Sequence, residues 1–469
     1  CAILLLTWGN SAQEDPNEER AHHNFLTVDG KHKGAQKPMI VSTKQQQIAK
    51  LAKEKPKLVF TSLNHQLDIE WLYEAYRLTR KDGAVGIDGE TARDYEQHLD
   101  ANLQSLLERV KSGRYRAPAI RRVFIPKGDG KLRPLGIPTF EDKLVQRAVV
   151  MLLEPIYEQT FYDCSFGFRP GYSAHQALQS LRNHIMDDGG KWVLDVDIQQ
   201  YFDTIEHTQL RNFLDQRVTD GVIRKMIDKW LKAGVMDGSK LKKSVIGTPQ
   251  GGVISPLLAN IYLHYVLDEW FANSVKPRML GRSSLTRFAD DFVMVFEHYE
   301  DCYRVQQVLT KRFTRYGLTL HPDKTRRVDF RFRYRKTNIQ RGKCVNFDFL
   351  GFTHYWGRSR RGHFVVCQKT AKNRLARTLK AFNVLCQKMR HKPLDLQWEW
   401  LNRRLVGHYV YFGITGNGKS LKRLHHKVER LWHKWLGRRS RKSYIPWARF
   451  TLLLKRFPLA IPRIYHRYV

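Results

Sequence analysis

Two adjacent carboxylates, Asp290 and Asp291, stand between two short β-type runs of the sequence. The runs over 286–289 and 292–296 predict two strands joined by a tight turn, which would bring both carboxylates to one exposed point. Like charges at one point repel, and a divalent cation relieves the repulsion. A lone Asp-Asp pair also fits an ordinary hairpin turn, so the pair alone does not establish a metal site.

A third carboxylate, Asp197, lies at the end of a predicted buried strand over 191–198. An aspartate at this position also fits the cap of a helix. Three carboxylates at strand ends are nevertheless what a two-metal phosphoryl-transfer site requires, with two Mg²⁺ ions about 3.5–4 Å apart that act on the attacking hydroxyl and the leaving pyrophosphate. The sequence therefore predicts that Asp197, Asp290 and Asp291 hold two Mg²⁺ ions.

A basic hairpin is predicted upstream of these carboxylates. Residues 119–126 and 132–137 have the pattern of two strands, and the turn between them contains Lys, Gly and Asp. Lys127 in the turn and Arg133 just after it are placed to neutralise a triphosphate, as Lys and Arg commonly do beside transferring phosphates. The hairpin is thus a candidate nucleotide-binding element.

The whole chain is strongly basic. Its 469 residues include 81 Lys and Arg against 45 Asp and Glu, a formal net charge of +36. Hydrophobic residues make up 42% and aromatic residues 12%, which is enough for packed cores and excludes a disordered basic tail. This charge predicts a polyanionic partner, and RNA or DNA is favoured over an acidic membrane surface or a generally basic soluble protein.

Membranes and zinc are not expected partners. No apolar run approaches the roughly 20 residues that cross a bilayer. The six cysteines include no pair at the two-residue spacing of zinc knuckles and ribbons, so no structural zinc is expected. Scattered single cysteines are typical of buried thiols in a reducing compartment.

The elements that must position these residues indicate an α+β fold. Residues 1–56 show no sustained periodicity and are predicted to be a poorly ordered leader, with order beginning near Lys57. Helical spacing follows over 67–78 and 95–110, and Ser255 with Pro256 predicts a capped helix start. After about residue 370 the strand patterns fade and the chain becomes helical and basic.

Six blocks, in this order, resemble the group II intron-encoded reverse transcriptase/maturases. The blocks are IPK at 125–127 with RPLGIP at 133–138, SFGFRPG at 165–171, Asp197 with YFD at 201–203, GTPQGGVISPLLANI at 247–261, FADD at 288–291, and FLGF at 349–352. Order and spacing match over residues 60–460. Nothing through Val469 matches the His-Asn-His nuclease with paired CxxC ligands that longer members carry, so the resemblance is to the bacterial type that lacks it.

The resemblance implies a right-hand polymerase that copies RNA into DNA with two Mg²⁺ ions. Residues 57–355 would form the fingers and palm, 356–418 the thumb and maturase RNA-binding region, and 419–469 a basic C-terminal nucleic-acid-binding region. The implied partners are group II intron RNA, an RNA template with a DNA primer or target DNA, and deoxynucleoside triphosphates. The implied location is the bacterial cytoplasm.

The resemblance also assigns nucleotide contacts by matching position. Lys127 and Arg133 would contact the incoming triphosphate, and Gln250 would lie near the templating pair. Phe202 would pack under the sugar and exclude a 2′-hydroxyl, although an aromatic residue after a strand is also typical of a core. Lys324 matches a later palm lysine that protonates the leaving pyrophosphate, although it also fits a solvated surface lysine.

Basic residues interleave with aromatic residues beyond residue 370, a pattern that suits phosphate contacts with base stacking. An amphipathic helix packed on the palm, or a solvated charged face, would show a similar pattern. The candidate nucleic-acid contacts are Arg169, Arg403, Arg404, Lys419, Lys422, Arg423, Lys427, Arg430, Lys434, Arg438 and Arg439.

The sequence thus predicts an RNA-directed DNA polymerase that also assists intron splicing. One alternative is a related bacterial reverse transcriptase recruited to defence or repair. Another is an RNA-binding splicing factor without polymerase activity, which the presence of all three carboxylates disfavours.

Overall fold

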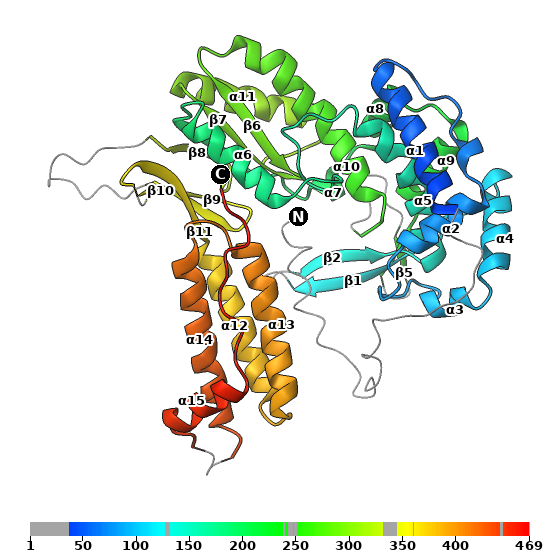
Figure 1. The fold of residues 1–469 in the computed structure, drawn as a ribbon. Helices are drawn as coiled ribbons and strands as arrows, with labels where there is room; N and C mark the ends of the chain where they lie inside the picture. The colour runs from blue at the N-terminus through cyan, green and yellow to red at the C-terminus, as the bar shows by residue number, and fades with distance from the viewer. Residues whose placement is uncertain are drawn as a thin grey trace.

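The computed structural model describes residues 37–126, 132–237, 240–242, 247, 251–331, 345–359, 361–440 and 444–468. Mixed helices and antiparallel sheets agree with the predicted α+β class (Figure 1). The first part of the chain is helical and comprises α1 (Lys37–Glu54), α2 (Ile69–Leu78), α3 (Ala92–Glu96), α4 (Leu99–Lys111) and α5 (Phe140–Tyr157). The apolar α5 is the centre of this region, because α1 and α2 both pack against it.

Helix α1 corrects the expectation that residues up to 56 are poorly ordered. Val41, Ile48 and Ala52 are buried along one side of α1, and Gln45 Nε2 donates to Met151 O at 3.1 Å. The apolar residues of α1 are few and widely spaced among polar ones, so the sequence shows no clear helical period. Packing of these residues against α5, and not local helix propensity, stabilises the helix. Residues 1–36 lie outside the described part of the chain.

The predicted hairpin is confirmed as β1 (Ile120–Pro126) and β2 (Leu132–Ile137), which pair antiparallel with Ile125 opposite Arg133. A parallel pairing joins β1 to β4 (Val235–Asp237), and β4 pairs with β5 (Lys240–Lys242). Strands far apart in the sequence therefore hold the base of the hairpin. The predicted turn, 127–131, lies outside the described residues.

A central antiparallel sheet carries the candidate carboxylates. Its strands follow the order β6 (Ser283–Phe288), β7 (Asp291–Phe296), β3 (Trp192–Val196) and β8 (Arg326–Asp329). Val193 and Val293 face the cluster that contains α6 (Ala174–Met186), whereas Leu194 and Met294 face the cluster that contains α11 (Tyr299–Arg315). The period-2 alternation of each strand thus buries both faces of the sheet, one under each helix.

Among the described residues, four α-helices lie in the connections from β3 to β4 and from β5 to β6. They are α7 (Tyr201–Thr204), α8 (His207–Asp215), α9 (Gly221–Lys232) and α10 (Ser255–Leu263). α10 starts at the predicted residue, but the residue at its N-cap is Ile254, so Ser255 is the first helical residue and not the cap. Pro256 fits there because the N–H that proline lacks has no partner in a first helical turn.

The C-terminal part is a small sheet followed by a helical bundle (Figure 1). β9 (Phe347–Phe349), β10 (Phe352–Arg358) and β11 (Phe364–Thr370) precede the mutually packed helices α12 (Lys372–Met389), α13 (Leu394–Phe412) and α14 (Gly418–Leu436), and α15 (Trp447–Arg456) covers the far end. We call α12, α13 and α14 the C-terminal bundle.

The bundle corrects two predicted boundaries. Leu405, Tyr409, Leu424 and Trp432 lie in one buried cluster, so α13 and α14 share a core and a division at residue 418 would cut through it. A division at residue 355 would likewise cut β10. Among the described residues, no helix combines the length and the apolar character that crossing a membrane requires.

Candidate active site

The three predicted carboxylates lie at neighbouring strand ends of the central sheet. β3 pairs with β7 so that Val196 lies opposite Phe292, and one further step in this register places Asp197 opposite Asp291. Opposed residues on antiparallel strands point to the same face, so these two carboxylates share one side of the sheet. Asp290 lies in the turn between β6 and β7, while Asp291 begins β7 itself.

Burial and like charge both act on these carboxylates. Burial, with the negative charges of Asp290 and Asp197, raises the pKa of Asp291 to about 6. A fourth carboxylate, Asp195, lies two residues before Asp197 on the same face of β3 and was not predicted. Burial raises the pKa of Asp195 to about 6 as well, with contributions from Asp291 and Asp197 that oppose its ion pair with Arg326 at 3.2 Å. The site therefore concentrates mutually repelling negative charge.

The chemistry of this donor set fits Mg²⁺, which binds carboxylate oxygens. As the side chains lie, however, no three His, Cys, Asp or Glu residues of the described ranges converge closely enough to hold an ion. Lys324 instead places its Nζ 2.7 Å from Asp197 Oδ2. The predicted Lys324 thus belongs to the site, and a metal ion binding there would have to separate this pair.

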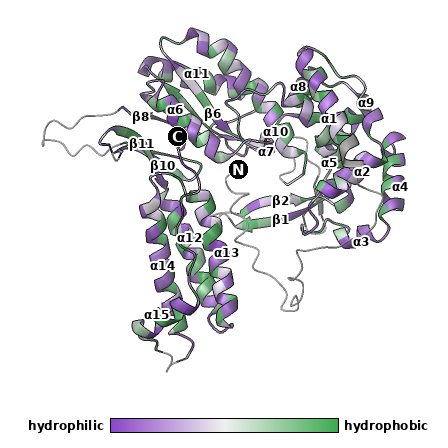
Figure 2. Cartoon of the chain, viewed as in Figure 1, coloured by the Kyte–Doolittle hydropathy of each residue, from purple (hydrophilic) through white to green (hydrophobic). Residues whose placement is uncertain are grey.

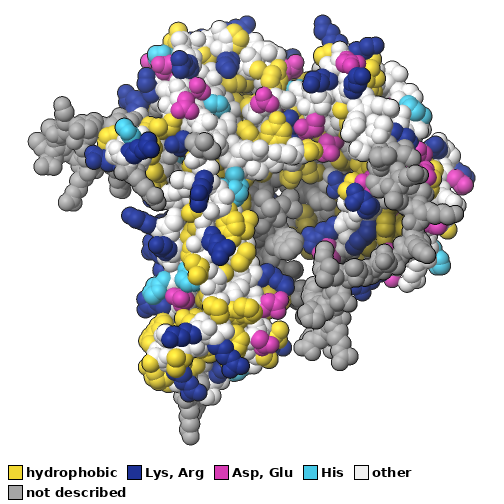
Figure 3. Space-filling model, in the orientation of Figure 1, with side chains coloured by type: hydrophobic (Ala, Val, Ile, Leu, Met, Phe, Trp, Pro, Cys, Tyr) yellow, Lys and Arg dark blue, Asp and Glu magenta, His cyan; other side chains and the backbone are white. Residues whose placement is uncertain are grey.

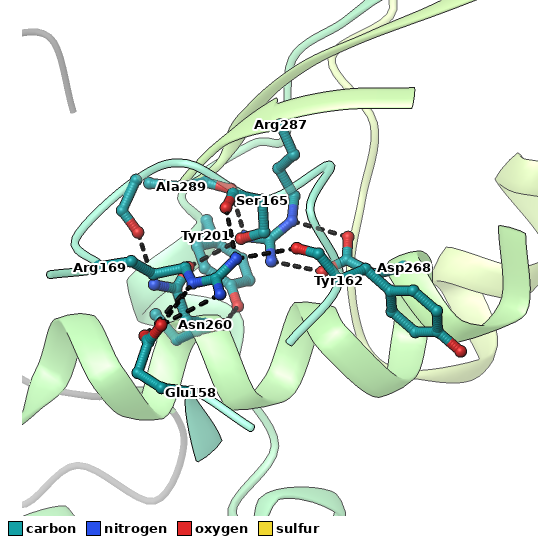
Figure 4. Close-up of polar contacts among 11 residues, drawn as sticks. Glu158, Tyr162, Ser165, Arg169, Tyr201, Asn260, Asp268, Arg287 and Ala289 are labelled. Atoms are coloured by element: carbon teal, nitrogen blue, oxygen red, sulfur yellow. Dashed lines mark hydrogen bonds and ion pairs between the residues drawn. The ribbon is translucent and has the colours of Figure 1, made fainter. Parts of the chain in front are cut away.

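A buried ion pair lies beneath the turn that carries Asp290. Arg287 and Asp268 are fully buried, and Nη2 of the arginine lies 2.5 Å from Oδ2 of the aspartate. Arg287 Nη1 also donates to Asn260 Oδ1 and to Ala289 O, both at 3.0 Å (Figure 4). The guanidinium therefore ties the turn to α10 and to the π-helical segment that follows it.

The 165–171 segment packs directly against the same turn. Two backbone hydrogen bonds join it to Arg287. The N–H of Arg287 donates to Cys164 O at 2.7 Å, and the N–H of Phe166 donates to Arg287 O at 2.8 Å. A Cβ built at Gly167 would lie 2.3 Å from Ala289 N, so only glycine permits this approach. Asn260 Nδ2 donates to Gly167 O at 2.6 Å and closes the contact.

Arg169 is a correction to the predicted nucleic-acid contacts. It is 7% exposed and forms an ion pair with Glu158 at 3.0 Å. Its Nη1 donates to Tyr162 O at 2.8 Å and to Ser165 O at 2.7 Å (Figure 4). Because the guanidinium is engaged inside the protein, Arg169 braces the 165–171 segment instead of facing nucleic acid.

Phe202 lies in α7 close to the carboxylates in sequence. Its ring is partly buried and lies 5.5 Å from the ring of Tyr201. A Cβ built at Gly247 would lie 2.9 Å from Phe202 O, and His207 Nε2 lies 2.7 Å from Gly247 O. Gly247 is therefore docked on the backbone of α7.

The remaining predicted nucleotide contacts are only partly described. Arg133 is half-buried on β2. A Cβ built at Gly251 would lie 2.2 Å from Gly136 O, so Gly251 packs against β2. Lys127 and Gln250 lie outside the described residues.

The predicted basic residues of α14 share one exposed face. Figure 2 shows hydrophilic and hydrophobic residues alternating along this helix, and Figure 3 shows Lys and Arg along the outer side of the bundle. The exposed members are Lys419, Lys422, Arg423, Lys427, Arg430 and Lys434, with Arg438 exposed just beyond the helix. Arg439 is half-buried and donates to Lys392 O at 3.1 Å.

The two basic residues predicted on α13 differ in exposure. Arg403 is exposed and pairs with Glu399 at 2.9 Å, while its guanidinium lies 5.4 Å from the ring of Trp400. Arg404 is half-buried, and burial lowers its pKa. Arg403 therefore remains a surface candidate for nucleic-acid contact, and Arg404 lies nearer the bundle core.

Removing one partner of the Arg287–Asp268 pair should strongly destabilise the protein. We expect Arg287→Met to lower the free energy of unfolding by about 3–5 kcal/mol, because it leaves a buried carboxylate without its counter-charge. Urea unfolding followed by tryptophan fluorescence measures the change, with the exposed Arg282→Met as the matched control. The double variant Arg287→Met with Asp268→Leu should regain part of the lost free energy of unfolding. If Arg287→Met is as stable as the control, the ion pair does not stabilise the fold.

The raised pKa of Asp291 predicts a pH-dependent stability. An unfolded Asp titrates near 3.9, so between about pH 4 and 6 the folded protein keeps a proton that the unfolded chain has lost, and stability falls as pH rises through that window. Without divalent cations, Asp291→Asn should be more stable than the parent at pH 7 and no more stable at pH 4. Urea unfolding at both pH values, beside the exposed control Asp323→Asn, tests this; a pH-independent gain would exclude ionisation as its cause.

Comparisons with known proteins agree with the geometry. Residues 125–354 match the family model described as reverse transcriptase (RNA-dependent DNA polymerase). Protein YkfC of Escherichia coli is 38% identical over 291 residues, which cover 55% of this chain and 76% of YkfC. The group II intron-encoded protein LtrA of Lactococcus lactis is 40% identical over 224 residues, 47% of this chain but only 37% of LtrA.

A plant relative extends the similarity to intron maturases. The mitochondrial nuclear intron maturase 2 of Arabidopsis thaliana is 29% identical over 177 residues, which cover 29% of this chain and 24% of the relative. The match to the family model contains β2 to β9 and all three carboxylates. The chain belongs to the reverse transcriptase family, and it is similar to a group II intron-encoded protein and to an intron maturase.

Proposed function

We propose that this chain is an RNA-directed DNA polymerase that binds group II intron RNA, assists its splicing and copies it into DNA. The observation that carries the proposal is the position of Asp197, Asp290 and Asp291 at adjacent strand ends, where the charges of Asp197 and Asp290 act on Asp291, in a chain of the reverse transcriptase family. The bacterial relatives support a bacterial cytoplasmic location.

In this proposal the parts of the fold correspond to a right hand. The N-terminal helices with the β1–β2 hairpin are the fingers, the central sheet is the palm, and the C-terminal bundle is the thumb (Figure 1). The hairpin, Gly247 and Gly251 then border the incoming nucleotide, because Gly251 packs on β2 while Gly247 docks on α7.

The proposed chemistry assigns separate tasks to the residues of the site. Asp197, Asp290 and Asp291 would hold two Mg²⁺ ions, which supply charge stabilisation to the attacking hydroxyl and the leaving pyrophosphate. Lys324, released from Asp197, would hold a proton beside the departing phosphates. Arg133 would neutralise part of the triphosphate charge, as guanidinium groups do in phosphoryl transfer.

The proposed RNA contacts lie away from the carboxylates. The exposed basic face of α14 presents repeated positive charge with no acidic residue in its first turn. Phosphate backbones bind such a face without needing base-specific contacts. Deoxynucleoside triphosphates and an RNA template with a DNA primer complete the proposed set of partners.

Replacing Asp290 and Asp291 with alanine should abolish cDNA synthesis and leave RNA binding intact. The two carboxylates act through the metal ions, whereas removal of negative charge from a basic protein does not weaken its attraction to RNA. Primer extension on an RNA template, beside a splicing assay with group II intron RNA, separates the two activities, and exposed Asp323→Ala is the control. Persistent cDNA synthesis would refute the metal assignment.

Phe202→Val should admit ribonucleotides. A smaller side chain opens space for a 2′-hydroxyl under the sugar of the incoming nucleotide, so the preference for deoxynucleotides should fall at least tenfold, the factor that corresponds to about 1.4 kcal/mol. Competing single-nucleotide incorporation of dNTP and NTP measures it, with Tyr201→Phe on the same helix as the control. An unchanged preference would make Phe202 a core residue only.

Neutralising α14 should reduce the salt dependence of RNA binding. Alanine at Lys422, Arg423, Lys427 and Arg430 should lower the slope of log affinity against log salt by roughly 0.7–0.9 for each phosphate that the protein no longer neutralises. The control set lies at the other end of the molecule, on or near α11: Lys276, Arg278, Arg304 and Lys311, all exposed. If both sets change the slope equally, α14 has no particular role in tracking the RNA backbone.

A further inference from the structure

Gln146, a buried residue of α5, forms a hydrogen bond with the segment that enters α10. Its Oε1 accepts from the backbone N–H of Ile254 at 3.2 Å. Ile254 is the N-cap residue of α10, and an N–H at that position has no acceptor within its own helix. Both residues are 2% exposed, so this N–H would be buried and unpaired without Gln146. The side chain thus supplies an acceptor that the helix itself cannot provide.

A buried carboxylate orients the amide of Gln146. Asp142, one turn earlier on α5, accepts from Gln146 Nε2 through Oδ2 at 3.0 Å. Its Oδ1 accepts from Trp230 Nε1 at 2.7 Å and from the hydroxyl of Tyr115. Burial raises the pKa of Asp142 to about 6, and these three donors oppose the shift because they stabilise the ionised form. An ionised carboxylate only accepts hydrogen bonds, so it keeps Nε2 turned toward Asp142 and Oε1 toward Ile254.

The same network lies beside the base of the β1–β2 hairpin. Ile120, the first residue of β1, lines one small cavity together with Gln146 and Trp230. At the other end of the segment that enters α10, Gly251 packs against β2. The first turns of α5 therefore hold both the base of the hairpin and the segment that touches its second strand.

We propose that Gln146 is a positioning residue for the incoming deoxynucleoside triphosphate. Its hydrogen bond to Ile254 holds the segment that begins at Gly251 against β2, and Asp142 fixes the orientation of the amide that this bond requires. The inference rests on the proposed polymerase function, in which Gly251 and the hairpin border the nucleotide. Gln146 is buried, so it acts through the backbone and not by touching the nucleotide. Small displacements of such a segment are costly, because binding and reaction both depend on orientation.

The donors and acceptors of the Asp142–Gln146 pair can be exchanged, which gives a specific test. Asp142→Asn puts an NH2 group where an acceptor was, and the amide of Gln146 can accept from it only by turning its own NH2 toward the N–H of Ile254. Gln146→Glu alone places two carboxylates side by side in the interior, where like charges repel. In the double variant, the new amide donates to the new carboxylate, which also accepts from Ile254. The hydrogen bonds are then complete again, with the same net charge.

The measurement is the equilibrium affinity for the next complementary dNTP, in a complex of the protein with an RNA template and a primer that ends in a dideoxynucleotide. We expect Asp142→Asn, Gln146→Glu and Gln146→Met each to weaken this affinity about tenfold, as for loss of one buried hydrogen bond. The double variant Asp142→Asn with Gln146→Glu should recover most of it, and affinity for the RNA–DNA duplex should be unchanged throughout.

Gln397→Met is the matched control. Gln397 is also a buried glutamine, and its Oε1 accepts from Trp432 Nε1 at 3.0 Å, but it lies in the C-terminal bundle. Its replacement should lower the unfolding midpoint and leave nucleotide affinity unchanged. If it weakens nucleotide binding as much as Gln146→Met does, or if the double variant recovers the midpoint but not the nucleotide affinity, Gln146 only stabilises the fold.

The remaining outcomes separate this inference from the proposed function. Unchanged nucleotide affinity in all single variants would overturn the inference. If a single variant unfolds, the double variant still decides, because it should match the parent in both midpoint and nucleotide affinity. If the parent binds nucleotide but makes no cDNA from an extendable primer, the polymerase proposal fails, and the affinities still decide the role of Gln146. A parent that binds no nucleotide would overturn both.

Discussion

The geometry of the candidate active site depends on one buried ion pair, Arg287 with Asp268. Both side chains are shut off from water, where an unpaired charge would be strongly unfavourable. The arginine is satisfied by the aspartate, by Asn260 and by the carbonyl of Ala289, which is the first residue of the turn that carries Asp290. The nitrogen atoms of the Arg287 guanidinium all have acceptors in this arrangement. Most other conformations of the turn would therefore leave a buried polar group unpaired.

Close backbone contact completes the support beneath the carboxylates. Gly167 meets Ala289 where any side chain would clash, and Arg169 fixes the segment that contains this glycine through Glu158 and backbone carbonyls. On the other side of the site, Gly247 and Gly251 allow one segment to touch both α7 and the β1–β2 hairpin. The glycines of these blocks therefore allow segments to pack closely against each other, and Arg169 holds its segment in place.

The central sheet and the C-terminal bundle share one hydrophobic cluster. Val293 from β7, Leu178 from α6, Phe352 from β10 and Leu405 from α13 belong to it, so the carboxylate-bearing face of the sheet is continuous with the bundle core. The opposite face packs into the cluster of α5, α10 and α11. A displacement of the bundle must therefore disturb the packing next to the carboxylates, because close-packed cores transmit strain. Polymerisation and RNA binding, if carried by these two parts, are mechanically linked.

The sequence by itself determined the local elements and the chemistry. Period-2 and period-3.6 patterns predicted β1, β2 and α2 closely, and the residue types and spacing of Asp197, Asp290 and Asp291 pointed to three carboxylates that lie at adjacent strand ends. Only the tertiary structure decided which other charges meet them. Asp195 joins the site because of strand register, Arg287 finds Asp268 through the packing of β6 on the helix after α10, and Arg169 turns inward to Glu158. Likewise α1 joins a core through α5, which lies far along the chain. Local periodicity shows which face of an element is apolar, but it carries no information on which distant segment will cover that face. The burial of each side chain, its charged partners and its pKa all depend on which segment packs there.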